Sequence, residues 1–232
     1  MWKEFFLVIK YNFLTNYIAP GYSFSQCNTD PAAEKNVLLI HGWGVRAVSM
    51  AKLAFFLAQA GFRLWIYDYP TSKLSIAEHA KRFLVLYRRE NIPSPLSVVT
   101  HSMGGLVLRH AMAQMTLAEC RQLAAVVMLG PPNRGSRLAL PGRWGVVRKF
   151  NASLGDMMPG VEALDIPVPL WLPPVGIIAG KWDEKVAYDA TALPDEYGTF
   201  ERITVSSSHA GLRNPKYSGE MVLKFLREKK FQ

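Results

Sequence analysis

Short apolar runs alternate along the chain with segments in which apolar residues recur at helical spacing. The run at 36–40 is almost entirely apolar, which is typical of a strand that is buried on both faces of a parallel sheet. The runs predict strands at 36–40, 62–67, 96–100, 124–129, 175–179 and 200–205. Helical spacing predicts helices at about 47–60, 75–90, 103–115 and 219–229. This alternation predicts an α/β fold with a mostly parallel central sheet and helices on both of its faces.

Local signals mark where several elements begin and end. Ser75 precedes a predicted helix and Glu78 stands three residues later, which is the spacing of a capping box. Gly61 follows another predicted helix and is a typical C-terminal stop. Residues 22–35 read as a polar connection without regular structure. Residues 137–174 have little periodicity and predict a helix with loops, which indicates a small lid or none.

The chain has 232 residues, half of them hydrophobic, and we expect residues 1–232 to form one domain. Residues 1–30 are expected to be an N-terminal aromatic helical extension. Apolar residues recur there at helical spacing: Trp2, Phe5, Phe6, Ile9, Phe13 and Tyr17. Two interpretations stay open, a helix packed on the body and a helix lying on a lipid surface. The apolar run at 5–9 is too short to cross a bilayer.

The formal net charge of +9 raises the question of anionic partners. The basic residues are scattered, and neither zinc-finger spacing nor an aromatic RNA-binding signature is present, so we expect no nucleic-acid partner. Cys27 and Cys120 lie far apart, which favours a reducing compartment such as the cytoplasm, with a single bridge left open. Peripheral contact with the membrane through the N-terminal segment is the alternative. No metal-ligand spacing or dinucleotide fingerprint occurs, so we expect no cofactor.

The stretch Thr100-His101-Ser102-Met103-Gly104 lies between a predicted strand and a predicted helix. A serine on such a tight turn exposes its hydroxyl, and the helix N-terminus directs backbone amides at a developing oxyanion. Gly104 meets the demand for a small neighbour, whereas Thr100 stands where the G-x-S-x-G pattern has glycine. We interpret Ser102 as a nucleophile, and the alternative is a serine that caps an ordinary helix.

A serine nucleophile needs a base and an acid that orients the base. His209 follows the last predicted strand, which is the position of the base in the order Ser, Asp, His. His79 and His110 fall within helical patterns, and the side chain of His101 is expected to point away from the serine. Asp183 follows the strand at 175–179 and is the expected acid.

Two further assignments complete the predicted site. Asp189 lies just beyond Asp183 and is the second candidate for the acid. The backbone N–H groups of Trp43 and Met103 are the expected donors of the oxyanion hole, because Trp43 lies in the loop after the strand at 36–40. Trp43 is also expected to border the acyl pocket.

These stretches together resemble the α/β-hydrolase superfamily, and more narrowly the bacterial lipases and esterases of the PGAP-like and triacylglycerol lipase group. The resemblance rests on residues 37–44, 98–107 and 128–136 and on 183–186 followed by 208–209. It implies the α/β-hydrolase fold with the triad Ser102, Asp183 and His209. The expected activity is cleavage of a small-molecule or lipid carboxylic ester through an acyl-enzyme intermediate. The alternatives are an acyltransferase or thioesterase with the same triad, and a non-catalytic binding module that retains the fold.

Overall fold

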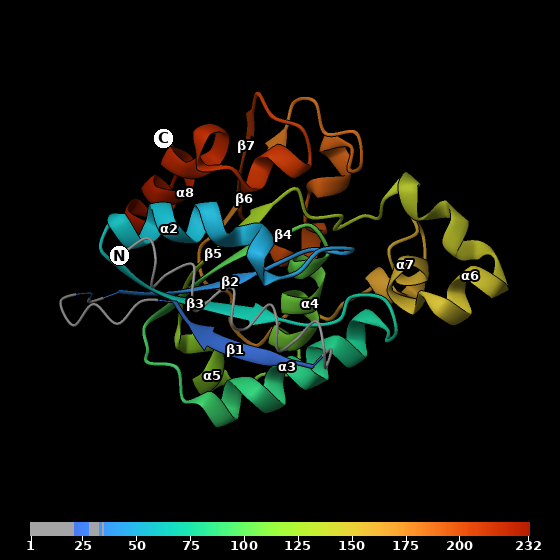
Figure 1. The fold of residues 1–232 in the computed structure, drawn as a ribbon, viewed down its shortest axis with the longest axis horizontal. Coiled ribbons are helices and arrows are strands. Elements are labelled where there is room, and N and C mark those ends of the chain that lie inside the picture. The colour runs from blue at the N-terminus through green and yellow to red at the C-terminus, as the bar shows by residue number, and fades with distance from the viewer. Residues whose placement is uncertain (1–20, 28–32, 34) are drawn as a thin grey trace.

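The computed structural model describes residues 21–27, 33 and 35–232, and within them the chain builds a seven-stranded sheet with the order β1-β3-β2-β4-β5-β6-β7 (Figure 1). β1 runs antiparallel to β3, and every other neighbouring pair is parallel. The strands are β1 Ser23–Gln26, β2 Lys35–Ile40, β3 Phe62–Asp68, β4 Leu96–His101, β5 Leu123–Leu129, β6 Val175–Gly180 and β7 Glu201–Val205.

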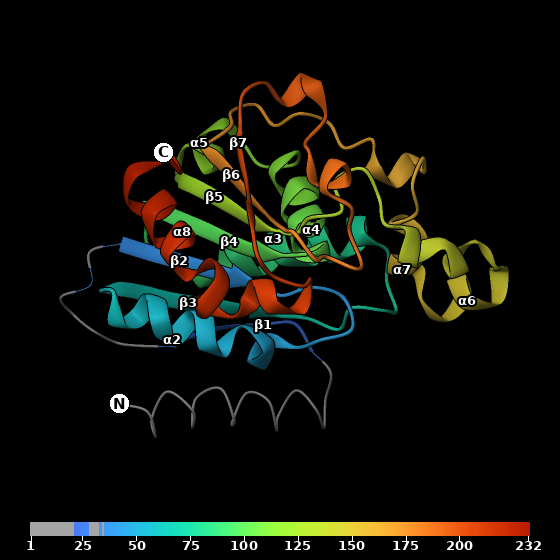
Figure 2. The same ribbon diagram turned by 90° about the horizontal axis from the view of Figure 1, so that it is seen from above.

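Helices cover both faces of this sheet (Figures 1 and 2). On one side lie α2 (Ala51–Gln59, after the 3-10 helix η1, Ala47–Met50) and α8 (Pro215–Glu228). On the other lie α3 (Ile76–Glu90), α4 (Met103–Met112) and the short α5 (Leu117–Arg121). The fold class expected from the alternation of strands and helices is therefore confirmed.

The pleat of β2 explains why its sequence is apolar without interruption. Leu38 and Ile40 pack into the core beneath α3 and α4, whereas Val37 and Leu39 pack into the core beneath α2 and α8. Successive side chains of a strand point to opposite faces, so a strand covered on both sides must be apolar at every position. All four side chains are fully buried.

Three elements differ from the predictions. Residues 23–26, expected to be part of a polar connection, form β1 at the edge of the sheet, where their side chains are only half-buried. The helix α5 was not predicted, although Thr116 and Glu119 form a capping box at its start. The last helix begins at Pro215 instead of residue 219, because the side chain of Asn214 caps it.

Other local predictions are confirmed. Ser75 and Glu78 form the expected capping box of α3, and Gly61 follows α2 with a φ of +88°. Cys27 and Cys120 are both free and buried, so they form no bridge. The predicted helical extension at 1–30 is wrong for its described part, since residues 23–26 form a strand, and residues 1–20 lie outside the part of the chain that the structure describes. Among the described helices, none combines the length and the hydropathy needed to cross a bilayer.

Residues 137–164 form a lobe that projects from the body after β5 (Figures 1 and 2). The lobe contains η2 (Arg137–Arg143), α6 (Gly145–Phe150), α7 (Ala152–Asp156) and η3 (Glu162–Leu164). Ser153 Oγ donates to Leu74 O at 2.6 Å, and Asp156 Oδ2 accepts from Ile76 N at 2.8 Å. These contacts fasten the lobe to the beginning of α3.

Candidate active site

Ser102 occupies the turn between β4 and α4 with a φ of 52° and a ψ of −126°. A residue with a side chain adopts such a conformation at a cost of about 1–3 kcal/mol, so the surroundings must hold it. Ser102 N donates to Leu129 O at 2.8 Å, and Ser102 O accepts from Gly105 N at 2.9 Å. The tight turn expected between the strand and the helix is therefore present at Ser102.

Glycines allow close approach of the backbone around this turn. A Cβ on Gly104 would lie 2.7 Å from the carbonyl oxygens of both Ile40 and His41. A Cβ on Gly105 would lie 3.3 Å from Oγ1 of the fully buried Thr100. Because Gly105 has no side chain, the side chain of Thr100 fits beside it. This explains how the turn accommodates threonine in place of the usual glycine.

His209 and Asp183 form a buried hydrogen-bonded pair. His209 Nδ1 donates to Asp183 Oδ2 at 2.7 Å, and both side chains are almost fully buried. The other carboxylate oxygen of Asp183 accepts from the backbone N–H groups of Lys185 at 2.9 Å and Val186 at 2.8 Å. Asp189 lies in η4 (Tyr188–Thr191) and is exposed. The structure therefore brings Asp183, and not Asp189, against His209.

Gly130 makes room for this pair at the end of β5. Its φ of +54° favours glycine, and a Cβ there would lie 3.1 Å from Asp183 Oδ2 and 3.2 Å from His209 Nδ1. Any side chain at this position would press on the hydrogen bond between the acid and the histidine. Sequence reasoning noted this glycine only as part of a motif.

His101 lies beside His209, so the expectation that its side chain points away from the serine is wrong. Its Nε2 donates to the backbone oxygen of His209 at 3.0 Å, and the two ring centroids are 4.8 Å apart. Burial, followed by the charge of His209, holds the pKa of His101 well below its usual range. A neutral His101 therefore supports the loop of His209.

Glu184 is a second support that sequence reasoning missed. Its carboxylate accepts from the backbone N–H of His209 at 3.2 Å. The loop of His209 is thus held through its carbonyl by His101 and through its amide by Glu184. Neither contact has a local sequence signal, because each joins segments that are far apart in the chain.

The loop after β2 carries Trp43 and is fixed by Asp68. His41 Nε2 donates to Asp68 Oδ1 at 3.0 Å, and Arg46 Nη2 donates to Asp68 Oδ2 at 2.6 Å. Burial alone would raise the pKa of Asp68, but the hydrogen bonds from His41 and Arg46 lower it far below its usual range. Gly44 N also donates to Thr71 Oγ1 at 3.0 Å. This network places the loop against the turn of Ser102.

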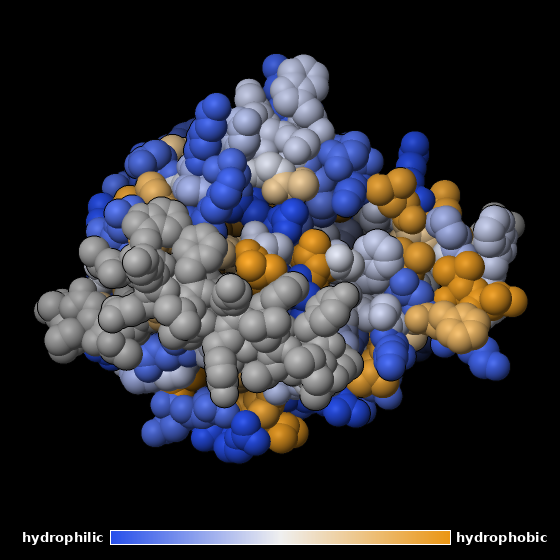
Figure 3. Space-filling view, viewed as in Figure 1, coloured by the Kyte–Doolittle hydropathy of each residue, from blue (hydrophilic) through white to orange (hydrophobic). Residues whose placement is uncertain are grey.

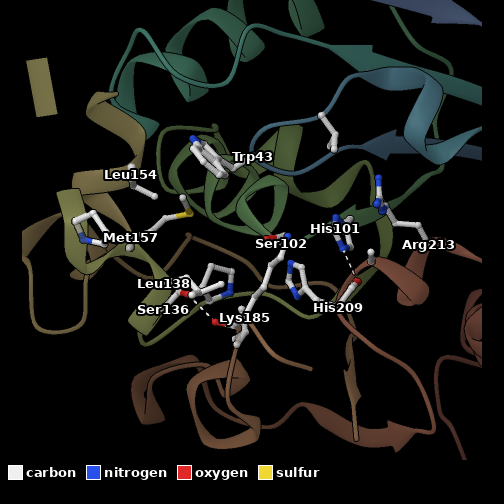
Figure 4. Close-up of a pocket in the computed structure, with 16 residues that line it drawn as sticks. Trp43, His101, Ser102, Ser136, Leu138, Leu154, Met157, Lys185, His209 and Arg213 are labelled. Atoms are coloured by element: carbon white, nitrogen blue, oxygen red, sulfur yellow. Dashed lines mark hydrogen bonds between the residues drawn. The ribbon is translucent and has the colours of Figure 1, made fainter. Parts of the chain in front are cut away.

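Ser102 and His209 open into a cavity of about 360 Å³ that Trp43 also lines, as expected (Figure 4). In Figure 4 these two side chains lie close together at the centre, with Leu154 and Met157 on one side and Arg213 on the other. Met103 follows Ser102 as the first residue of α4, so its N–H has no partner within the helix.

Among the residues that the structure describes, no group of histidine, cysteine and carboxylate side chains is arranged to hold a metal ion. The charged residues that line the cavity, apart from its histidines, are the cations Lys185 and Arg213.

Solved structures place this architecture in the α/β-hydrolase fold. The mature lipase BlEst2 of Bacillus licheniformis superposes with a TM-score of 0.65 at 14% identity, covering 89% of this chain and 98% of that one. Est1E of Butyrivibrio proteoclasticus with bound ferulic acid gives a TM-score of 0.67 at 17% identity, covering 90% of this chain and 94% of that one. Lipase B of Aspergillus fumigatus gives 0.71 at 14% identity, covering 88% and 56%. At such identities the similarity shows the fold.

A family model gives a separate comparison. The model described as a domain of unknown function, DUF7379, matches residues 14–166, which is more than half of the chain. The chain therefore belongs to the DUF7379 family. No curated protein matches the sequence.

Proposed function

We propose that this protein is a serine hydrolase that cleaves carboxylic esters through an acyl-enzyme intermediate. The observation that carries the proposal is the buried pair of Asp183 and His209, whose histidine lines one cavity together with Ser102. A binding module would have no need for a carboxylate that holds a histidine beside a strained serine. The lipases and esterases with the same fold support this activity, and the PGAP-like subgroup is part of the proposal.

In this proposal each residue of the site has a defined role. His209 Nε2 takes the proton of Ser102 Oγ as the oxygen attacks the ester carbonyl carbon. Asp183 holds Nδ1–H and stabilises the imidazolium that forms. The carbonyl oxygen becomes an oxyanion that the N–H groups of Trp43 and Met103 stabilise.

The remaining steps release the alcohol and the acid. The oxyanion collapses, the bond to the alcohol oxygen breaks, and His209 gives its proton to that oxygen. Water then gives its proton to His209 and attacks the acyl-enzyme, and collapse of the second tetrahedral intermediate returns Ser102 Oγ–H and a carboxylic acid. None of these reaction steps requires a cofactor.

The substrate is proposed to be a small-molecule or lipid ester, with no nucleic acid involved. Leu154 and Met157 lie on the side of the cavity where an acyl chain would rest. A cytoplasmic location and peripheral membrane contact of the N-terminal segment remain parts of the proposal. Thioester cleavage and acyl transfer would use the same three side chains, so the experiment must separate them from ester hydrolysis.

Labelling by a fluorophosphonate probe tests the nucleophile. We expect the wild-type protein to be labelled and the Ser102→Ala variant to remain unlabelled. The matched control is Ser206→Ala, since Ser206 is an exposed serine in the segment after β7. Equal labelling of Ser102→Ala, or no labelling of the wild type, would contradict the proposal.

A substrate panel then tests the reaction. It comprises p-nitrophenyl esters of increasing acyl length, a butyryl thioester, and added alcohol as an alternative acceptor. Release of free acid from the oxygen esters supports hydrolysis. Products made only from the thioester or only with the added alcohol would replace ester hydrolysis by one of the two alternatives.

A further inference from the structure

The lobe of residues 137–164 exposes a group of large apolar side chains. We call this group the apolar face, and it consists of Leu138, Leu140, Trp144, Val146 and Phe150, whose exposed fractions range from 48% to 73%. Figure 3 shows hydrophobic residues gathered over this end of the molecule. Single exposed apolar residues are common on protein surfaces, but a cluster of this kind marks a surface that another body covers.

The charges in the segment that carries the apolar face all have one sign. From Arg137 to Gly155 the sequence has the basic residues Arg137, Arg143, Arg148 and Lys149 and no acidic residue. The side chains of Arg137 and Lys149 are exposed. Tryptophan, phenylalanine and aliphatic residues together with cations are typical of segments that lie in the interface of an anionic membrane.

The apolar face borders the opening of the active-site cavity. Leu138 belongs to the apolar face and also lines the cavity. Asn151 directly follows Phe150, and its side-chain oxygen accepts from Trp43 Nε1 at 3.0 Å. The apolar face and the cavity therefore meet at Leu138.

From this placement we propose that the apolar face docks on the surface of an anionic lipid layer. Arg137 and Lys149 meet the phosphate groups of the lipids while Trp144, Val146 and Phe150 enter the region of the acyl chains. A second copy of the chain is a poorer occupant, because a two-fold contact would bring the cations of both faces together. The proposal concerns where the protein binds and does not depend on ester hydrolysis.

The experiment needs a local readout, because the predicted helix of the first residues is a separate candidate for lipid contact. Val146→Cys in α6 supplies it, since Cys27 and Cys120 are buried and leave residue 146 as the accessible thiol among the described residues. An environment-sensitive fluorophore is attached to Cys at 146 in the full chain with Ser102→Ala, which excludes lipid cleavage. The matched control carries Val85→Cys in α3, where the valine is 66% exposed.

We expect phosphatidylglycerol vesicles to shift the emission at position 146 to the blue and to raise it about twofold, with little change at position 85. Phosphatidylcholine vesicles should give a much weaker response. Lys149→Glu should weaken the apparent vesicle affinity at position 146 by about tenfold or more, because each basic residue near an anionic surface contributes to binding. Lys81→Glu on α3 should have little effect.

Three results would overturn the proposal. The first is an unchanged emission at position 146 with anionic vesicles, and the second is an equal response at position 85 or with neutral vesicles. The third is a blue shift at position 146 that rises with protein concentration in the absence of lipid, which would identify a second copy as the occupant. Since Ser102→Ala is used throughout, none of these results bears on whether the wild-type protein cleaves esters.

Discussion

The close approach of the Trp43 loop to the nucleophile can be tested by adding one methyl group. Gly42 immediately precedes Trp43, and a Cβ at Gly42 would lie 2.9 Å from Ser102 Cβ and 2.9 Å from His101 Nδ1. It would also lie 3.0 Å from the backbone oxygen of His101. These obstacles are backbone atoms, a Cβ and a buried ring, so none can rotate away. Gly42→Ala must therefore move the loop and the turn apart.

The size of the movement follows from the contact distances. Carbon atoms in contact lie about 3.5–4.0 Å apart, so Gly42→Ala separates the Trp43 loop from Ser102 by about 0.6–1.1 Å. A displacement near 1 Å can lower a catalytic rate about a hundredfold, and loss of one oxyanion donor costs about 10²–10³ in kcat. We expect kcat/KM to fall about a hundredfold and the free energy of unfolding to fall by about 1–3 kcal/mol.

The assay combines three measurements on the purified variant: kcat/KM for p-nitrophenyl butyrate, the rate constant of fluorophosphonate labelling, and the free energy of unfolding in urea. Gly145→Ala is the matched control, because a Cβ at Gly145 would meet no atom within 4 Å. We expect the control to keep wild-type values in all three measurements. A folded Gly42→Ala protein with kcat/KM within about threefold of wild type would refute the reasoning, since the displacement derived from the contacts is large enough to misplace an oxyanion donor.

Three other substitutions test separate parts of the structure. Asp183→Asn should lower kcat by about a hundredfold or more with little change in KM, while Asp189→Asn should keep wild-type activity. The reverse pattern would contradict the assignment of Asp183 as the acid. Asp68→Asn removes the carboxylate that Arg46 contacts, so the free energy of unfolding in urea should fall by about 3 kcal/mol. A fall below about 0.5 kcal/mol would count against the network. Burial lowers the pKa of His79 from 6.5 to about 4, so the unfolded chain binds the proton more readily and Tm should fall as the pH drops from 6.5 towards 4. His79→Gln should flatten this decrease, and an unchanged slope would show that His79 is not responsible.

The sheet could be predicted because a strand that is buried on both faces has apolar residues at successive positions. β5 is apolar throughout and β2 from Val37 to Ile40, and the glycine and capping signals bound the helices between the strands. β1 has no such apolar run, because an edge strand of four half-buried residues needs only a partner strand. The short α5 carried a capping box, but too few residues to show a helical period.

The candidate site could be predicted in part. Chain order pointed to Ser102 and His209, but it could not separate Asp183 from Asp189, because both follow β6. The two differ because the backbone N–H groups of Lys185 and Val186 donate to Asp183 Oδ1 and hold this carboxylate in place. His101 was misjudged because its partner, the backbone oxygen of His209, lies 108 residues further along the chain.

The strand order has a consequence for how the protein would lose activity. Ser102 follows β4 in the middle of the sheet, whereas His209 follows β7, the last strand in the order. β7 is only half-buried over most of its length and, among the described strands, pairs with β6 alone. Segments of this kind open locally at a lower free energy than the centre of a domain. Opening of β7 would withdraw His209 while the turn of Ser102 stays folded, so heat inactivation should follow the local stability of the C-terminal edge and precede melting of the whole domain.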